Sequence, residues 1–175
     1  LYARDHVGDE PFAVLLGDTV VASHTDKTVT RQLADVVEAR GGSAVALQRV
    51  SPDKVSRYGI LGGPAVAPGL IKADVFVEKP KAEEAPSNLA VSARYVLSPR
   101  IFHHLQSTPP GKGGELQLTD AMASLMREEA LHGLVYDGQR HDIGNKLDFL
   151  KANLHFALQR DDIAPALREY LKTLV

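Results

Sequence analysis

Apolar residues occur along the chain in two alternating patterns, short unbroken runs and stripes at helical spacing. This alternation predicts an α/β fold. Residues 12–16 form an unbroken apolar run, which favours a strand buried on both faces of a sheet. Residues 28–40 carry apolar side chains at helical spacing and end at two glycines, which predicts a helix, and residues 43–50 return to a strand. Further strands are predicted at 70–77, 89–97 and 134–136, and further helices at 99–105, 120–131, 146–159 and 163–174.

The segments between these elements have the composition of loops. Residues 51–69 are rich in glycine and proline, and residues 81–88 are polar, so both are predicted to be loops. Pro80 has no N–H to donate and is expected to end the strand before it. Thr119 is predicted to cap the helix that follows it, and residues 109–114 are expected to form a flexible loop.

Two aspartates of the chain are candidate metal ligands. Asp18 comes directly after the apolar run, at the carboxyl end of a predicted strand, where open α/β sheets bind ligands. Asp142 lies in an Asp-Ile-Gly turn. Taken alone, each favours a turn or cap residue. Taken together, two carboxylates would suit Mg²⁺, which takes one or two protein carboxylates and completes its shell with water and phosphate.

Glu78 and Lys79 form a charged pair at the end of a predicted strand. A solvated surface pair is the simplest interpretation. The alternative is a sugar-phosphate site, because a carboxylate accepts from sugar hydroxyls and an ammonium suits a phosphate. Neighbours in a strand point to opposite faces, so both side chains serve one ligand only if the strand has ended or twisted there. Gly59 is either a turn glycine or a point where backbone approaches a ligand.

Composition excludes several classes of function. The chain of 175 residues has no cysteine, which excludes a disulfide framework, a thiolate metal site and a cysteine nucleophile, and which fits a cytoplasmic protein. A formal net charge of −2 without a basic patch argues against nucleic acid as a partner. No apolar run approaches the ~20 residues that span a membrane. The seven histidines show no metal-ligand spacing, and His141 is expected to be a loop residue.

Several segments, taken in order, resemble the bacterial type of UTP–glucose-1-phosphate uridylyltransferase, a sugar-nucleotidyltransferase. The segments that carry the resemblance are Gly-Asp-Glu-Pro-Phe-Ala-Val-Leu-Leu-Gly-Asp at 8–18, Tyr-Gly-Ile at 58–60, Val-Glu-Lys-Pro at 77–80, Ala-Pro-Ser-Asn-Leu-Ala at 85–90, Arg-Tyr-Val-Leu at 94–97, Gly-Gly-Glu-Leu-Gln-Leu-Thr-Asp-Ala at 113–121 and His-Asp-Ile-Gly-Asn-Lys-Leu at 141–147. They cover most of the chain.

The resemblance implies a fold, a reaction and a set of site residues. The fold is a Rossmann-like three-layer α/β/α nucleotidyltransferase fold with a mixed sheet, here as a single domain over residues 1–175. The reaction joins UTP and glucose 1-phosphate to give UDP-glucose and pyrophosphate. The resemblance assigns Asp18 and Asp142 to a magnesium site. It assigns Gly59 to a backbone contact with the sugar, Glu78 to the sugar hydroxyls and Lys79 to the sugar phosphate. Dimers or tetramers are common in this family, so a homo-oligomer is expected.

Two departures from the family pattern limit this interpretation. The family's glycine-rich Gly-x-Gly-Thr-Arg loop, which binds the triphosphate and the base, is absent. We therefore expect the sequence to be the C-terminal portion of the enzyme, inactive by itself. Thr19 stands where the family often has a second Asp, a change that we expect to be tolerated. Two alternatives stay open: another sugar-nucleotidyltransferase, such as a thymidylyltransferase, and a non-catalytic module for sugar-phosphate binding or oligomerisation.

Overall fold

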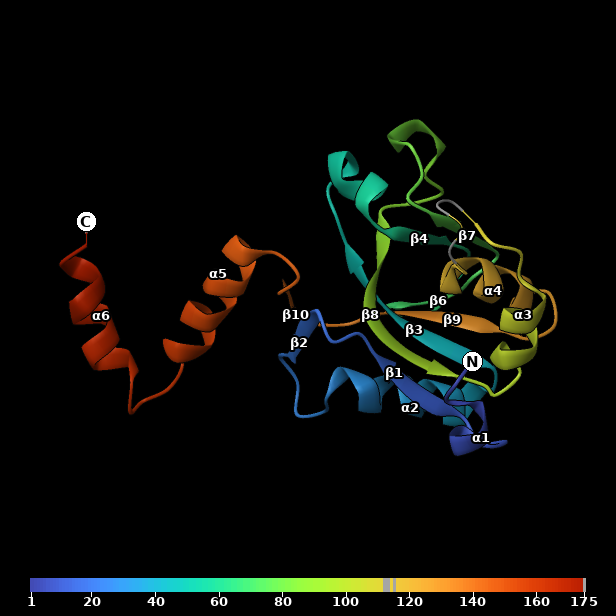
Figure 1. The fold of residues 1–175 in the computed structure, drawn as a ribbon, viewed down its shortest axis with the longest axis horizontal. Helices are drawn as coiled ribbons and strands as arrows, with labels where there is room; N and C mark the ends of the chain where they lie inside the picture. Colours follow the sequence, from blue (N-terminus) through green and yellow to red (C-terminus); the bar gives the residue numbers. More distant parts are fainter. Residues whose placement is uncertain (112–113, 115, 175) are drawn as a thin grey trace. The chain divides into compact units, whose positions relative to one another are not determined.

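The computed structural model describes residues 1–111, 114 and 116–174 (Figure 1). Lys112 and Gly113 of the loop predicted at 109–114 lie outside the described residues, as does Glu115 after it. The chain forms two compact units. The sheet unit comprises Leu1–Leu16 and Ser23–Gly138, and the helical unit comprises Gly17–Ala22 and Gln139–Val175. The single domain predicted for residues 1–175 stays a prediction, and each unit is described by itself.

The described residues of the sheet unit form an eight-stranded mixed sheet. The strands run in the order β5-β6-β9-β3-β8-β4-β7, and β1 pairs with β8. β3 and β9 run parallel, whereas the other described pairs of this sheet are antiparallel. The predicted α/β class with a mixed sheet is thereby confirmed. The strand bounds are β1 Phe12–Leu15, β3 Ser43–Arg49, β4 Gly59–Gly62, β5 Ala65–Ala67, β6 Leu70–Lys72, β7 Val75–Glu78, β8 Leu89–Leu97 and β9 Leu131–Val135.

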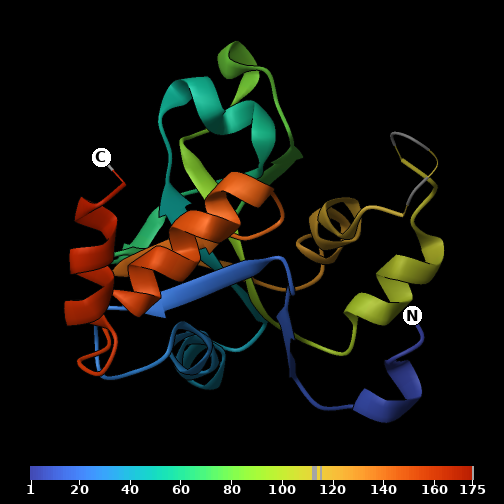
Figure 2. The same cartoon turned by 60° about the vertical axis from the view of Figure 1, so that its left-hand side comes forward.

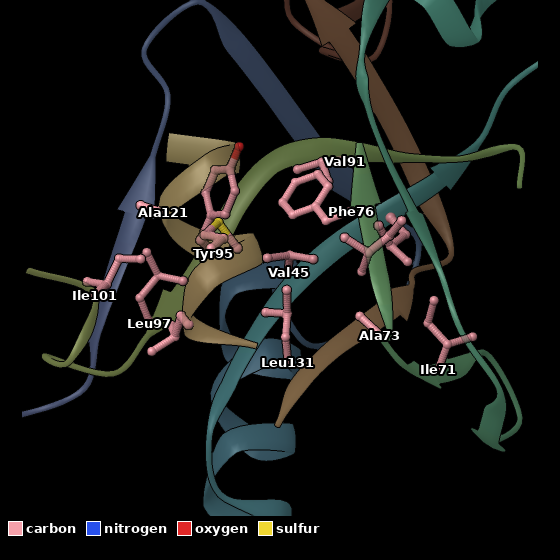
Figure 3. Close-up of a cluster of buried hydrophobic side chains, with 14 of the residues drawn as sticks. Val45, Ile71, Ala73, Phe76, Val91, Tyr95, Leu97, Ile101, Ala121 and Leu131 are labelled. Carbon is pink, nitrogen blue, oxygen red and sulfur yellow. The ribbon is translucent and has the colours of Figure 1, made fainter. Parts of the chain in front are cut away.

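Helices cover both faces of this sheet. Val45 and Leu47 of β3 point into the main core, where α3 and α4 pack, while their neighbours Ala44 and Ala46 point to the face on which α2 lies. Figure 3 shows the main core, in which Phe76 and Tyr95 lie among aliphatic side chains from several strands and from α4. The helices of this unit are α1 Arg4–Val7, α2 Val29–Arg40, α3 Ile101–Ser107 and α4 Leu118–Leu125, with short 3-10 helices at Pro52–Arg57 and Ala82–Glu84.

The helix at 28–40 and the strands at 43–50 and 89–97 agree with the sequence pattern. α2 begins after Thr28, whose hydroxyl accepts a hydrogen bond from the Arg31 N–H, and it ends at Gly41 with φ of 71°. β8 contains an irregularity that the pattern does not predict. Ala93 has φ of 53°, and the pairing of β8 with β3 shifts register there.

The predicted loop at 51–69 is wrong. β4 and β5 lie within it, because glycines provide space where neighbouring elements approach closely. A Cβ on Gly62 would lie 2.7 Å from Val75 Cγ1, so only a glycine allows β4 to pack there. The strand predicted at 70–77 is also wrong as one element, since β6 pairs with β9 whereas β7 pairs with β4.

The prediction that residues 12–16 are buried on both faces is wrong for the described residues. β1 pairs with β8 alone among them, and Ala13 and Leu15 are exposed while Phe12 and Val14 are half-buried. Leu15 is 55% exposed. One face and one edge of β1 are therefore open in the part of the chain that the structure describes.

The helical unit consists of a two-stranded ladder and two helices. β10 (Gly138–Asp142) pairs with β2 (Thr19–Ser23), and the helices are α5 (Lys146–Ala157) and α6 (Ala164–Lys172), coloured orange and red in Figure 2. The pattern predicted both helices but neither strand. The apolar side chains of α5 and α6 are largely exposed, whereas an apolar stripe on a helix normally faces the core. The exposed side chains are Leu147, Phe149, Leu150, Leu154 and Tyr170.

No described helix combines the length and the apolar character that a membrane span requires.

The buried ring of His132 is expected to make the folded protein less stable in acid. It lies on β9 with 5% of its surface exposed, and both ring nitrogens are buried without a hydrogen-bond partner among the described residues. Burial lowers its pKa, and the nearby charges of Arg40 and Lys72 lower it further. The unfolded state therefore takes up this proton first. The contribution of the neutral His132 ring to the free energy of unfolding is complete above its pKa in the unfolded state, ~6.5. That contribution is lost as the pH falls from there toward the lower pKa that the ring has in the folded state.

We expect the midpoint of urea unfolding to fall between pH 7 and pH 5, and we expect His132→Leu to flatten that fall. His103→Leu, on the exposed side of α3, is the matched control and should retain the wild-type slope. Equal pH slopes for wild type and His132→Leu would show that this ring does not set the acid sensitivity.

Candidate functional site

The sheet unit brings Gly59, Glu78 and Lys79 together at the end of two paired strands. Gly59 of β4 stands opposite Glu78 of β7 in the antiparallel ladder, and the Lys79 N–H donates to the Tyr58 carbonyl, 3.0 Å away. We call Gly59, Glu78, Lys79 and Thr119 the Glu78 corner. The pairing explains why residues far apart in the sequence meet here, because an antiparallel register sets each residue opposite one partner.

Lys79 turns back toward Glu78 because its backbone leaves the strand. Its φ is 47°, a left-handed conformation that is uncommon for a residue other than glycine. The Lys79 Nζ consequently lies 3.8 Å from Glu78 Oε1, so the two side chains are on one side despite being neighbours in sequence. Both groups are accessible, with 61% of the Lys79 side chain and 29% of the Glu78 side chain exposed, so this ion pair contributes little to stability.

Gly59 packs closely against the Glu78 carboxylate. A Cβ at position 59 would lie 2.8 Å from Cε2 of Phe76 and 3.0 Å from Glu78 Oε2. A side chain there would displace the carboxylate or the phenyl ring, so the glycine is required for packing as well as for access to the backbone.

Thr119 is a member of this corner that the sequence analysis missed. It was predicted to cap a helix at 120–131, but α4 begins at Leu118 with Gln117 at its cap position. The Thr119 hydroxyl instead donates to Glu78 Oε2 at 2.7 Å. The sequence contains no signal for this contact, because the two residues are 41 positions apart and a threonine before a helix is normally a cap.

Asp18 and Asp142 converge within the helical unit. The Ile143 N–H donates to the Asp18 carbonyl at 2.7 Å, next to the β2–β10 ladder. Gly144 lies between the two carboxylates. A Cβ on Gly144 would lie 3.3 Å from Asp142 Oδ1 and 3.8 Å from Asp18 Oδ2. The two carboxylates thus border one small space that a glycine leaves open.

The atoms around this space suit a hard divalent cation. Asp142 Oδ1 accepts from the Gly144 N–H at 3.0 Å, and Asp18 Oδ1 accepts from the Thr19 hydroxyl at 3.2 Å, so each carboxylate is oriented through one oxygen. The described residues contain no group of three or more His, Cys, Asp or Glu side chains that could hold a metal ion. Two carboxylates without further protein ligands are what Mg²⁺ commonly uses, whereas Zn²⁺ normally requires three or four.

Comparisons with known proteins show the family of this chain. A model of the nucleotidyl transferase family matches residues 1–159. The chain belongs to that family. It is 42% identical over 175 residues to a putative UTP–glucose-1-phosphate uridylyltransferase from Methanocaldococcus jannaschii. The match covers 100% of this chain and 59% of that relative, so the chain spans about three-fifths of the length of the relative.

Solved structures show the same likeness in three dimensions. A UDP-glucose pyrophosphorylase complexed with UDP-glucose matches with a TM-score of 0.85 and 35% identity, over 90% of this chain and 60% of that one. The UTP-bound UGPase from Acinetobacter baumannii matches with a TM-score of 0.89 and 31% identity, over 99% of this chain and 60% of that one. The predicted resemblance to uridylyltransferases is confirmed at the level of the family.

His141 is not the loop residue that the sequence analysis predicted for this nucleotidyltransferase chain. It is a buried residue of β10, and its ring packs against His155 and Phe156 of α5 at centroid distances of 4.5 and 4.9 Å. Burial lowers its pKa, and the neighbouring His155 lowers it further. The ring joins α5 to the strand that carries Asp142.

Gly144→Ala is expected to weaken magnesium binding without unfolding the protein. The added methyl group would enter the space between Asp18 and Asp142 and would contact Asp142 Oδ1 at 3.3 Å. We expect the magnesium concentration for half-maximal activity of the complete protein to rise about tenfold, the scale seen when a group that orients a metal ligand is changed. Gly17→Ala, where a Cβ has open space within 4 Å, is the control. Equal magnesium requirements in both variants would place the metal elsewhere.

Proposed function

We propose that the complete protein transfers a uridylyl group from UTP to glucose 1-phosphate, giving UDP-glucose and pyrophosphate. The observation that carries the proposal is the left-handed backbone at Lys79, which sets an ammonium 3.8 Å from the Glu78 carboxylate. The carboxylate can accept hydrogen bonds from hydroxyl groups, and the neighbouring ammonium can bind a phosphate. Together they suit a sugar phosphate. Non-glycine residues with positive φ concentrate at functional sites, where the rest of the fold holds them in place.

In this proposal each group of the Glu78 corner holds one part of glucose 1-phosphate. Glu78 accepts hydrogen bonds from sugar hydroxyls, Lys79 binds the phosphate, and the absent side chain of Gly59 lets the sugar approach the backbone. Holding the phosphate in one orientation lowers the entropic part of the barrier, and the ammonium stabilises charge on the phosphate oxygens.

Asp18 and Asp142 would hold Mg²⁺ in the space beside Gly144. When bound, the ion would neutralise charge on phosphate oxygens. The two aspartates would then act by fixing the position of that charge. Their orientation is supported by the bonds from Thr19 and from the Gly144 backbone. Thr19 stands where the family often has a second carboxylate, and the expected tolerance of that change stays a prediction.

The proposed reaction is a single in-line displacement. A phosphate oxygen of glucose 1-phosphate attacks the α-phosphorus of UTP, a new P–O bond forms, and the bond from the α-phosphorus to the bridging oxygen breaks as pyrophosphate leaves. No side chain of the described residues needs to become bonded to substrate. Catalysis in this scheme comes from positioning and electrostatics.

We further propose that the activity requires more of the enzyme than these 175 residues. Support comes from the match, which covers about 59% of the M. jannaschii relative, and from β1, whose exposed face carries Ala13 and Leu15 and whose second edge is unpaired among the described residues. The 175 residues alone are then expected to be inactive. The expected homo-oligomer and cytoplasmic location stay predictions.

Pyrophosphate release by the complete protein tests the function directly. The assay uses glucose 1-phosphate and Mg²⁺ with either UTP or dTTP. We expect UTP to give the higher kcat/KM. A preference for dTTP would reassign the protein to the thymidylyltransferases. Absence of pyrophosphate with any nucleoside triphosphate, together with retained binding of glucose 1-phosphate, would identify a sugar-phosphate-binding module instead.

A further inference from the structure

The two oxygens of the Glu78 carboxylate have different surroundings. Oε2 points toward the protein, where it accepts the 2.7 Å hydrogen bond from Thr119 and where a Cβ on Gly59 would approach it to 3.0 Å. Oε1 is 3.8 Å from Lys79 Nζ, too far for a hydrogen bond. One oxygen is therefore engaged within the protein, and the other is directed toward the charge that would bind a phosphate.

Thr119 is itself held firmly by the core. It lies in the first turn of α4, and three later residues of that helix, Ala121, Met122 and Leu125, are fully buried. α4 packs against β7, the strand that ends at Glu78. The hydroxyl is thus carried on a rigid element, which is the condition for orienting a flexible glutamate side chain.

We propose that Thr119 is a positioning residue for sugar recognition: by binding Oε2 it orients the Glu78 carboxylate so that Oε1 receives the sugar hydroxyls. This rests on the proposed function of the Glu78 corner in binding a sugar 1-phosphate. Glu78 has rotatable bonds that a single backbone position does not fix, and a half-exposed glutamate without Thr119 would sample several orientations. A sugar would have to select among them, at a cost in affinity.

This role differs from the two that a threonine at a helix start normally has. A cap would bond the helix backbone, but this hydroxyl donates to a side chain of another element. A purely structural bond would affect unfolding, yet this one joins a half-buried carboxylate at the protein surface, where removal is well tolerated. The effect of losing it should therefore fall on the sugar substrate.

The test compares Thr119→Val with Thr119→Ser in the complete protein. Valine keeps the shape of threonine and removes the donor, whereas serine keeps the donor. We expect Thr119→Val to raise the KM for glucose 1-phosphate about tenfold with little change in the KM for UTP, and to lower selectivity for glucose 1-phosphate over galactose 1-phosphate. Thr119→Ser is expected to restore wild-type values.

Two controls separate positioning from folding. Ser124→Ala removes another hydroxyl from α4, one that bonds His104, and should leave both KM values unchanged. In a Glu78→Gln background, Thr119→Val should add little further loss, because the two changes act on one contact. Additive effects in that double variant would overturn the proposal.

The outcomes distinguish this inference from the proposed function. A wild-type protein that uses glucose 1-phosphate while Thr119→Val matches it in KM and in selectivity would overturn the inference alone. Equal increases in the KM values for UTP and for glucose 1-phosphate would also overturn it. A wild-type protein that neither turns over nor binds glucose 1-phosphate by calorimetry would overturn both.

Discussion

Asp18→Asn in the complete protein is expected to lower kcat about 10²-fold or more at a fixed magnesium concentration, with the fold intact. Losing one preorganised charge from a site that stabilises phosphoryl transfer has effects of about this size. Asp18 is exposed and does not belong to the core, so its carboxylate can be changed without loss of packing. Asparagine keeps the shape of the side chain and removes the negative charge that a hard cation requires.

Asp161→Asn is the matched control for this measurement. Asp161 is another exposed aspartate of the helical unit and should keep wild-type activity. Raising the magnesium concentration should recover part of the activity of Asp18→Asn, because the remaining carboxylate of Asp142 still borders the site. Wild-type kcat and an unchanged magnesium requirement in Asp18→Asn would remove Asp18 from the metal site.

Lys79→Ala is expected to lower kcat/KM for glucose 1-phosphate about 10²-fold and to affect UTP binding far less. A hydrogen bond to a charged group contributes about 1.5–3 kcal/mol, which corresponds to roughly ten- to a hundred-fold. The measurement is the pair of KM values in the pyrophosphate-release assay. Equal losses for both substrates would contradict the assignment of Lys79 to the sugar phosphate.

Lys79→Gly provides a second and sharper comparison. Because φ at this position is 47°, glycine fits the backbone better than alanine does. We expect the free energy of unfolding of Lys79→Gly to be about 1 kcal/mol higher than that of Lys79→Ala. Both variants are expected to lose kcat/KM for glucose 1-phosphate to the same extent. Lys81→Ala, which removes an exposed lysine paired with Glu84, should leave the kinetics unchanged. Recovery of activity in Lys79→Gly would show that backbone strain, and not the ammonium, matters.

The sequence by itself was sufficient for elements whose signal is local. α2, β3 and β8 were predicted close to their observed bounds, because a cap, a glycine stop and a period of apolar residues are all contained within one segment. The five predicted site residues rest on residue type and on an ordered family resemblance, and their roles stay predictions. The structure brings Asp18 close to Asp142, and Gly59 close to Glu78 and Lys79.

Features that depend on contacts between distant segments required the tertiary structure. The sequence pattern predicts a loop at the glycines of β4, whereas the structure shows that they make room for Val75 and Phe76 of the paired strand. The exposed face of β1 has the same composition as a buried one. Pro80 gave a reason for the strand to end near Lys79, but the pattern of residues gives none for the Thr119 hydroxyl to leave the helix backbone and bind the Glu78 carboxylate.

The physical reason is that local sequence encodes the period and the turn chemistry of one segment, whereas packing and hydrogen-bond partners belong to pairs of segments. Residue types and their order were therefore enough to predict an α/β nucleotidyltransferase chain, in which the sugar-phosphate site and the metal site stay proposals. Only the register of β4 against β7, the position of α4 and the β2–β10 ladder decided how those side chains are oriented.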